Sequence, residues 1–340
     1  MKSERLPELI NGWFVVAFSR DVPKGRVHVV RYMDQPVALF RTASGRLAAV
    51  DGYCPHLGAS FENMGSVVGE ELRCGAHDFR FDCQGSCTHA YGAPLATVHL
   101  RTWHVREQLG AIFLWYHHED APPTWELPTW SEPRWGRARP SSFRIRSHPQ
   151  LVVENGIDRG HFEAVHGFHA PEPGHLELDG HHLTMLTSFT ADARIVGRIG
   201  RAVQVSLKYE VFGLGLAMAE SFVPSIDAHL RSFVASTPRG DGTVDLRCWV
   251  SVHDAKRMAR RVPAVGRVLP GFVAGPVMER LVHRVFLYDF RKHVRDLDHR
   301  RHLTPAGLSR HDAHLAPYRE WAKQFYPPIP ERVSLPVLVA

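Results

Sequence analysis

Residues 54–59 read CPHLGA and residues 74–79 read CGAHDF, and these two short stretches tell the most about the first third of the chain. Each stretch supplies one cysteine and one histidine, and together they form the pattern C-x-H-x17-C-x2-H. Thiolates and imidazoles presented in this way by two loops are typical metal ligands. The candidate ligands are Cys54, His56, Cys74 and His77.

The chemistry of these ligands favours an iron–sulfur cluster over zinc. A Rieske [2Fe–2S] cluster needs two thiolates on one iron and two imidazoles on the other, which two such loops would supply. Structural zinc sites pair Cys with Cys and His with His at wider gaps, so the spacing of Cys54 and His56 fits them less well. Coincidence in a chain with 23 histidines is the remaining alternative. We predict one [2Fe–2S] cluster in a small all-β domain over residues 1–117, where short apolar runs alternate with turn residues.

The amino-acid sequences of the two loops also resemble those of the Rieske domain family. In the high-potential members of that family, each cluster loop carries a further cysteine, and the two form a disulfide. The corresponding positions here are Ala59 and Ala76. The resemblance therefore implies the low-potential class to which oxygenases belong. Cys83 and Cys87 lie outside the ligand loops and are expected to be structural thiols.

A second motif lies in residues 154–167, which read ENGIDRGHFEAVHG. Two histidines and a carboxylate form the facial triad that holds oxygen-activating Fe(II). His161 and His166 are five residues apart, or roughly 140° around a regular helix. A widened π-type turn or an unwinding helix end at Gly167 must therefore bring them together. A surface helix with two unrelated histidines is the alternative interpretation.

The spacing Asp158-x2-His161-x4-His166 resembles the mononuclear iron motif of the Rieske oxygenases. Asp158 and His161 are expected on one side of the helix, because they are three residues apart. The resemblance implies that Asp158 connects His161 to the cluster ligand His77 of a neighbouring subunit. Such a route requires a ring of subunits, typically a homotrimer.

The third iron ligand is expected to be Asp289, on a predicted helix over residues 271–301. Asp289 falls within or beside the apolar side of that helix, where an unpaired carboxylate would be costly and a metal would satisfy it. Asp296 and Asp298 are competitors, but both stand among charged residues and look solvated. The sequence of residues 308–326 resembles the C-terminal part of ketosteroid hydroxylases and cholesterol desaturases of the Rieske class. This resemblance supports Asp289 as the third iron ligand.

The rest of the chain predicts a second domain of the α+β class. Six prolines between residues 118 and 149 suggest an extended connection. Residues 150–340 would then form the catalytic domain, built on an antiparallel sheet, and the resemblance implies the helix-grip (START-like) type. Residues 211–218 could line a pocket or fill the core, and we favour the core. The expected strands are 183–189, 202–211, 230–235 and 244–252, and the expected first helix is 152–167.

Charge and composition limit the partners. The net charge of +6 is spread along the chain, which could favour an acidic redox partner, and no nucleic-acid motif accompanies it. The sequence has no run of about 18 apolar residues, so no membrane span is expected. Five cysteines, an odd number, and no signal peptide argue against a secreted disulfide scaffold, so a cytoplasmic protein is expected.

These features together predict an enzyme that uses O2. Electrons from a separate ferredoxin or flavin reductase would reach the cluster and then Fe(II), and a hydrophobic substrate would be hydroxylated or desaturated. The C-terminal resemblance favours a steroid- or sterol-like substrate, with an aromatic or natural-product substrate as the main rival. A Rieske electron carrier without substrate chemistry and a zinc-dependent interaction module are the two hypotheses from other classes.

Overall fold

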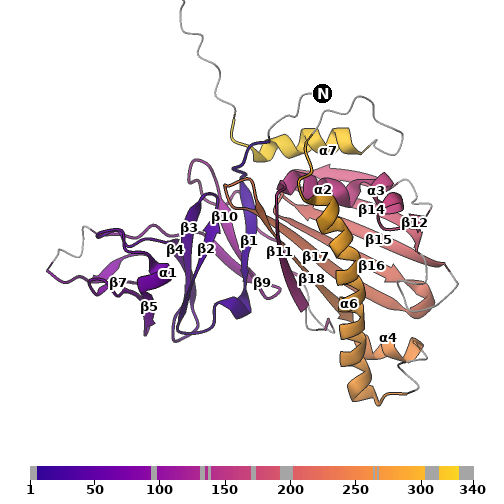
Figure 1. The fold of residues 1–340 in the computed structure, drawn as a ribbon, viewed down its shortest axis with the longest axis horizontal. Helices are drawn as coiled ribbons and strands as arrows, with labels where there is room; N and C mark the ends of the chain where they lie inside the picture. Colours follow the sequence, from indigo (N-terminus) through magenta and orange to yellow (C-terminus); the bar gives the residue numbers. More distant parts are fainter. Residues whose placement is uncertain are drawn as a thin grey trace, which may run out of the picture.

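The computed structural model shows an elongated molecule with an all-β domain at one end and a large sheet with helices at the other (Figure 1). This confirms the predicted α+β class. The described residues are 6–92, 98–130, 135–136, 139–169, 174–191, 202–262, 265, 268–302 and 314–328.

The N-terminal domain consists of three small antiparallel sheets, ordered β1-β10-β9, β2-β3-β4 and β5-β6-β7-β8. The last sheet, with the short helix α1, lies at the far end of the molecule (Figure 1). Its core is aromatic and aliphatic, with Phe61, Leu72 and Phe81 almost fully buried. The elements are β1 (Gly12–Phe18), β2 (Arg26–Tyr32), β3 (Gln35–Arg41), β4 (Leu47–Asp51), α1 (Phe61–Met64), β5 (Gly65–Val68), β6 (Glu71–Cys74), β7 (Phe79–Phe81), β8 (Cys87–His89), β9 (Val105–Gln108) and β10 (Ala111–Tyr116), with a 3-10 turn η1 (Ser19–Asp21).

The second domain is built on one eight-stranded antiparallel sheet, in the order β11-β18-β17-β16-β15-β14-β12, with β13 also paired to β14. The long helix α6 packs along β18 and β11, and α2 and α3 lie beside it (Figure 1). The strands are β11 (Arg139–Ile145), β12 (Phe168–His169), β13 (His175–Asp179), β14 (His182–Ala191), β15 (Val203–Phe212), β16 (Leu216–Val223), β17 (Ala228–Pro238) and β18 (Val244–His253). The helices are α2 (Pro149–Ile157), α3 (Arg159–Ala164), α4 (Ala255–Arg261), α6 (Gly271–Leu297) and α7 (Leu315–Ala322), with 3-10 turns η4 (Pro224–Ile226) and η6 (Lys323–Phe325).

The alternation of side chains in β18 determines which face of the sheet each helix and domain covers. Val244, Leu246 and Cys248 pack with Phe290 of α6 in one apolar cluster. Trp249, on the opposite face, packs against the N-terminal domain in another. Because successive strand residues point to opposite faces, one strand contributes to two cores.

The two domains are joined by shared packing as well as by the chain. Phe14 and Tyr32 of the N-terminal domain belong to the same buried cluster as Val153 and Leu183 of the second domain. Arg247 of β18 donates hydrogen bonds to backbone carbonyls of β1 at 2.8 and 2.9 Å. The position of the sheet relative to the N-terminal domain is therefore set by apolar burial and by specific polar contacts.

Two predicted segments differ from the structure. The expected connection over residues 118–149 contains β11, which pairs with β18 at the edge of the sheet. Pro140 is compatible with that strand because an edge strand leaves some backbone N–H positions unpaired. The single helix expected over residues 152–167 is divided into α2 and α3 at Asp158. Residues 211–218 lie in β15, β16 and their turn, and they are buried in the core, as expected.

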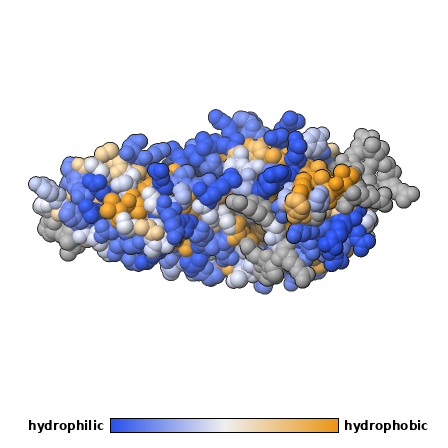
Figure 2. Space-filling model, turned by 90° about the horizontal axis from the view of Figure 1, so that it is seen from below, coloured by the Kyte–Doolittle hydropathy of each residue, from blue (hydrophilic) through white to orange (hydrophobic). Residues whose placement is uncertain are grey.

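One face of the molecule is predominantly hydrophilic (Figure 2). On the face drawn in Figure 2, hydrophilic side chains prevail, and hydrophobic ones form small groups. None of the helices in the described ranges has the length and apolar character of a membrane-crossing segment.

A buried ion pair between Arg319 of α7 and Glu154 of α2 connects these two helices. The carboxylate of Glu154 is 1% exposed, and Arg319 binds both of its oxygens, with Nε–Oε2 and Nη2–Oε1 distances of 2.7 and 2.8 Å. Arg300 adds a longer contact of 3.7 Å. Two parallel charge-assisted hydrogen bonds fix the orientation of both side chains.

Arg319→Ala should lower the free energy of unfolding by about 3 kcal/mol, because it leaves the buried Glu154 carboxylate without its main partner. Lys323→Ala is the matched control, since it removes an exposed ion pair with Glu320 from the same segment and should change stability by less than about 0.5 kcal/mol. Denaturant unfolding followed by fluorescence measures both. Equal effects would show that the buried pair does not stabilise the C-terminal helix.

Candidate active site

The two cluster loops lie together at the free end of the N-terminal domain. The loop of residues 54–59 precedes α1, and residues 74–79 connect β6 to β7. The imidazoles of His56 and His77 are exposed, with ring centroids 4.8 Å apart, and His56 stacks on Phe79 at 4.4 Å. The two histidines predicted as ligands are therefore neighbours, and their rings are accessible to another molecule.

The two cysteines of the motif lie beneath these loops. Cys54 and Cys74 are both buried. Burial, together with the neighbouring Cys74 thiol, raises the pKa of Cys54 to about 11. A thiol of this kind loses its proton when it binds a metal ion. Gly58 turns the first loop with a φ of +75°, and its N–H donates to the Cys54 carbonyl at 2.9 Å. Two paired thiols and two paired imidazoles are the donor set of a Rieske cluster.

The second predicted motif begins where α2 ends. Asp158 has an extended backbone (φ −80°, ψ 104°), so it ends α2 and precedes α3. Its carboxylate accepts a hydrogen bond from the backbone N–H of His161 at 3.1 Å and so caps α3. The prediction that Asp158 and His161 lie on one side of a continuous helix is therefore wrong, because an N-cap residue lies outside the helix that it starts.

The end of α3 brings the two histidines together. α3 ends at Ala164, and Gly167 follows in the left-handed region with a φ of +68°. His166 therefore lies beyond the helix, and its Nε2 is 3.1 Å from Nε2 of His161. Of the two alternatives that the five-residue spacing left open, a π-type turn and an unwinding helix end, the structure shows the second. A regular helix would have directed the two rings apart.

Asp289 of α6 reaches the same place from the other side of His166. Its Oδ2 is 2.7 Å from Nδ1 of His166, and its Oδ1 is 3.1 Å from Nζ of Lys292. Burial opposes ionisation of this carboxyl, but the hydrogen bond from His166 holds the pKa of Asp289 below its ordinary value. The three residues predicted from the sequence therefore meet, with Asp289 bound to the ring nitrogen that faces away from His161.

Two further residues of α6, not predicted as ligands, also contact this pair. Nδ1 of His293 is 3.0 Å from Nε2 of His161. Oδ2 of Asp296, the competing candidate, lies 3.5 Å from Nδ1 of His161, and this residue is exposed, as the sequence suggested. The spacing of 289, 293 and 296 is i, i+4, i+7, which places all three on one side of a helix. That periodicity was the signal available in the sequence.

The network around His161 and His166 suits a metal ion. The carboxylate of Asp289 lies 2.7 Å from Nδ1 of His166, and the more distant carboxylate of Asp296 lies 3.5 Å from Nδ1 of His161, so a proton on each Nδ1 leaves both Nε2 atoms as acceptors. The Nε2 lone pairs of both rings then point at one another, an arrangement that a cation stabilises. Burial, together with the neighbouring His166, lowers the pKa of His161 to about 4, so this ring is neutral at pH 7. Neutral imidazoles with nearby carboxylates match the donors that bind Fe(II).

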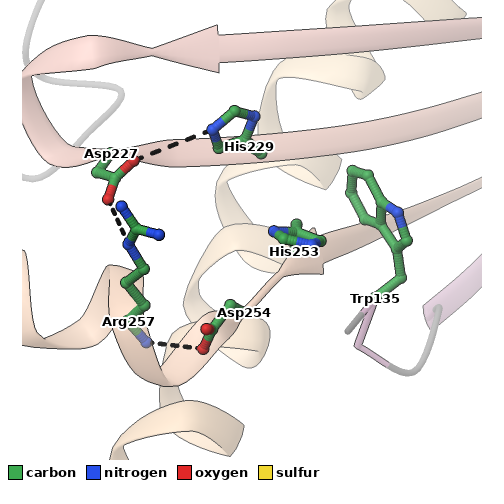
Figure 3. A pocket seen from close by; sticks show the side chains of 6 residues that line it. All are labelled: Trp135, Asp227, His229, His253, Asp254 and Arg257. Carbon is green, nitrogen blue, oxygen red and sulfur yellow. Dashed lines mark hydrogen bonds and ion pairs between the residues drawn. The ribbon is translucent and has the colours of Figure 1, made fainter. Parts of the chain in front are cut away.

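Another group of histidines lines a cavity of about 290 Å³ at β17, β18 and α4 (Figure 3). His229 and His253 pair across β17 and β18 there. The nearby carboxylate of Asp227 forms an ion pair with Arg257 at 2.6 Å. A guanidinium that already neutralises the carboxylate leaves little attraction for a cation. The lining residues are Trp135, Asp227, His229, His253, Asp254 and Arg257.

Family comparisons cover both domains. The Rieske [2Fe-2S] domain family matches residues 12–99, and the family described as the 3-ketosteroid 9alpha-hydroxylase C-terminal domain matches residues 114–326. Cholesterol 7-desaturase of Bombyx mori is 26% identical over 358 residues, covering 96% of this chain and 71% of that protein. The oxygenase component of 3-ketosteroid-9-alpha-monooxygenase from Rhodococcus rhodochrous is 24% identical over 331 residues, covering 93% of this chain and 80% of that protein. The match to a cholesterol 7-desaturase of Ciona intestinalis spans only 44% of that protein.

Solved structures share the fold of this chain. Dicamba monooxygenase bound to dicamba superimposes with a TM-score of 0.67 at 20% identity, over 93% of this chain and 96% of that one. NdmA of Pseudomonas putida CBB5 with caffeine gives a TM-score of 0.68 at 16% identity, over 92% and 89%. The residues that match the first family include the cluster loops, and those that match the second include His161 and His166. The chain therefore belongs to the Rieske non-haem iron monooxygenases, which carry one [2Fe–2S] cluster and one mononuclear iron.

Proposed function

We propose that this protein is the oxygenase component of an electron-transfer system that hydroxylates or desaturates a steroid- or sterol-like substrate with O2. The observation that carries the proposal is the presence of two different metal-binding sets in one chain, one at the tip of the N-terminal domain and one between α3 and α6. The names of the relatives, cholesterol 7-desaturase and 3-ketosteroid-9-alpha-monooxygenase, support the substrate class.

The two sites have different proposed roles: electrons enter at the cluster, and oxygen is activated at the iron site. The cluster ligands are Cys54, His56, Cys74 and His77. His161 and His166 hold the iron, and Asp289 supplies the carboxylate of the site. Iron bound there supplies oxygen activation, and the protein positions the substrate and excludes water. The exposure of the cluster histidines and the burial of His161 fit this division, since electrons must enter from outside and oxygen chemistry must be shielded.

An apolar wall beside the histidines supports a hydrophobic substrate. Phe168 stacks on Phe189 with ring centroids 4.2 Å apart, and it also lies 5.4 Å from the ring of His166. Phe162 packs against both phenylalanines at 6.2 Å. Aromatic faces of this kind contribute large apolar contact area and few polar groups. A fused-ring or similarly flat hydrophobic molecule would be stabilised by them.

Electrons are proposed to cross between subunits. Within one chain, the cluster loops lie near α1 and β7 at one end of the molecule, and the iron site lies near α3 at the other end (Figure 1). We propose a homotrimer in which His77 of one subunit lies near Asp158 of the next, which leads to His161. A separate ferredoxin or flavin reductase supplies the electrons. None of the five cysteines, all of which are described, forms a disulfide, which fits the reducing cytoplasm as the proposed compartment.

The purified holoenzyme should contain three irons and two acid-labile sulfides per chain. An electron carrier without substrate chemistry would contain two irons, and a zinc module would be colourless without sulfide. Incubation with a reductase, O2 and a panel of steroids, aromatics and lipids, followed by mass spectrometry, tests the substrate class. Oxygen added to, or hydrogen lost from, an aromatic acid alone would contradict the steroid proposal.

Asp289→Ala should empty the mononuclear site, because the iron loses the carboxylate of its proposed ligand set. The cluster should be spared, so iron falls from three toward two per chain while sulfide stays at two. Metal analysis together with the visible spectrum of the cluster measures this. Unchanged iron content would remove Asp289 from the site.

Asp158→Asn should keep both metal centres but lower turnover by roughly 10- to 100-fold. Asparagine still caps α3, so the effect of the lost charge is separated from the effect of a lost cap. The measurement is a single turnover, in which the cluster is reduced first and its reoxidation by O2 and substrate is followed at visible wavelengths. Wild-type reoxidation kinetics in the variant would contradict the proposed bridge.

Mixed oligomers test the route between subunits. Chains with His77→Ala lack the cluster, and chains with His161→Ala lack the iron, so each variant alone should be inactive. Co-expressed chains should recover a measurable part of wild-type turnover, because an intact cluster can then lie beside an intact iron site of the neighbour. The absence of any recovery in oligomers shown to contain both chains would place electron transfer within one chain.

A further inference from the structure

Asp78 directly follows the proposed cluster ligand His77 and turns the second cluster loop. Its φ is +56°, in the left-handed region that aspartate and asparagine adopt more readily than most residues other than glycine. Phe79, which comes next, is buried, begins β7 and stacks on the ring of His56. The backbone at Asp78 therefore connects an exposed imidazole to the buried start of a strand.

The Asp78 carboxylate is bound by two guanidinium groups. Nε of Arg73 donates to Oδ1 at 2.5 Å. Nη2 and Nε of Arg80 donate to Oδ2 and Oδ1 at 3.2 and 3.3 Å. Nε2 of His89 lies 3.6 Å from Oδ2. Charge-assisted hydrogen bonds to both oxygens fix the carboxylate beside the loop.

The sheet places these basic side chains in one row. Arg73 of β6 pairs with Arg80 of β7, and Arg80 pairs with His89 of β8. Side chains at directly paired positions lie on one face about 5 Å apart, and like charges there repel each other. Asp78 is bonded to both arginines, so its carboxylate offsets that repulsion. Glu71 is farther away, at 4.0 Å from Arg80.

This row of charges lies beside the proposed cluster ligands. Arg73 precedes Cys74, and Asp78 follows His77, so each charge is one residue from a ligand. A [2Fe–2S] cluster gains one negative charge when it accepts an electron, and its reduction potential depends on the charges around it. Nearby arginines favour the reduced form, whereas a carboxylate between them and the loop opposes it.

We propose that Asp78 is a positioning residue that keeps the reduction potential of the cluster low, because its carboxylate neutralises Arg73 and Arg80 and holds the His77 loop. The proposal deepens the function given above and rests on it only for the presence of the cluster. A cluster of low potential passes its electron more readily to the iron site, since the free energy of transfer follows the difference in potential.

The experiment measures the reduction potential of the cluster in the purified full chain. A redox titration at low ionic strength, where charges are least screened, is followed by electron paramagnetic resonance of the reduced cluster. Asp78→Asn removes the charge, but asparagine tolerates the left-handed backbone and still accepts a hydrogen bond. Glu70→Gln is the matched control. Glu70 lies at the other end of β6, about 13 Å along the strand from Cys74, and it accepts hydrogen bonds from Ser44.

Asp78→Asn should keep two acid-labile sulfides per chain, while its equilibrium constant for one-electron reduction rises roughly tenfold, the effect of one nearby unit charge. This is a shift of about 59 mV to higher potential. Glu70→Gln should change the same constant less than twofold. An unchanged or lower potential in Asp78→Asn would overturn the proposal, and so would an equal shift in the control.

A second variant tests the same idea with the opposite sign. Arg80→Gln removes a positive charge and leaves Asp78 bonded to Arg73, so the potential should fall. A rise or no change would overturn the proposal even if Asp78→Asn failed to fold.

Neither measurement requires substrate or turnover. An enzyme with both shifts and no activity toward steroids would fail the proposed function alone. An active enzyme whose potential is the same in all variants would fail this proposal alone.

Discussion

Two interruptions of helical geometry, at Asp158 and after Ala164, are the constraint on which the metal site depends. The first starts a new helix whose N-terminus is capped by the Asp158 carboxylate. The second releases His166 from the helix, so that its ring turns toward His161. Each interruption is local and is stabilised by a hydrogen bond or by a glycine in the left-handed region. The other residues of the site pack against the α3 segment that these two interruptions define.

Helix α6 supplies that packing and the remaining polar groups. Its residues 289, 293 and 296 lie on one side, and each contacts a ring from the α3 segment. The same helix buries Phe290 and Met278 against the sheet. A polar network in such apolar surroundings is stable only when its members are mutually satisfied. The apolar packing of α6 thus determines where its carboxylates and imidazole meet the two histidines.

The two sites lie in different environments because they lie in different domains. The cluster loops protrude from a small sheet with a compact aromatic core, so their imidazoles stay accessible while their thiols are buried. The histidine group lies between two helices and a wide sheet. Electron transfer requires contact with other proteins, whereas oxygen chemistry requires the exclusion of water. The two domains that carry these sites pack against each other through a shared apolar core.

The sequence by itself predicted the α+β class, and it singled out two pairs of histidines that lie side by side in the structure, because these features depend on residue type and spacing along short segments. The five-residue spacing also predicted that a regular helix cannot continue from His161 to His166, but it did not decide between a π-type turn and an unwinding helix end. The break at Asp158, the strand β11 inside a proline-rich segment, and the positions of His293 and Asp296 depended on tertiary structure. The spacing of 289, 293 and 296 places these residues on one side of a helix, but it does not tell what that side contacts. Only the packing of α6 against α3, more than a hundred residues away in sequence, decides which side of the helix meets the two rings.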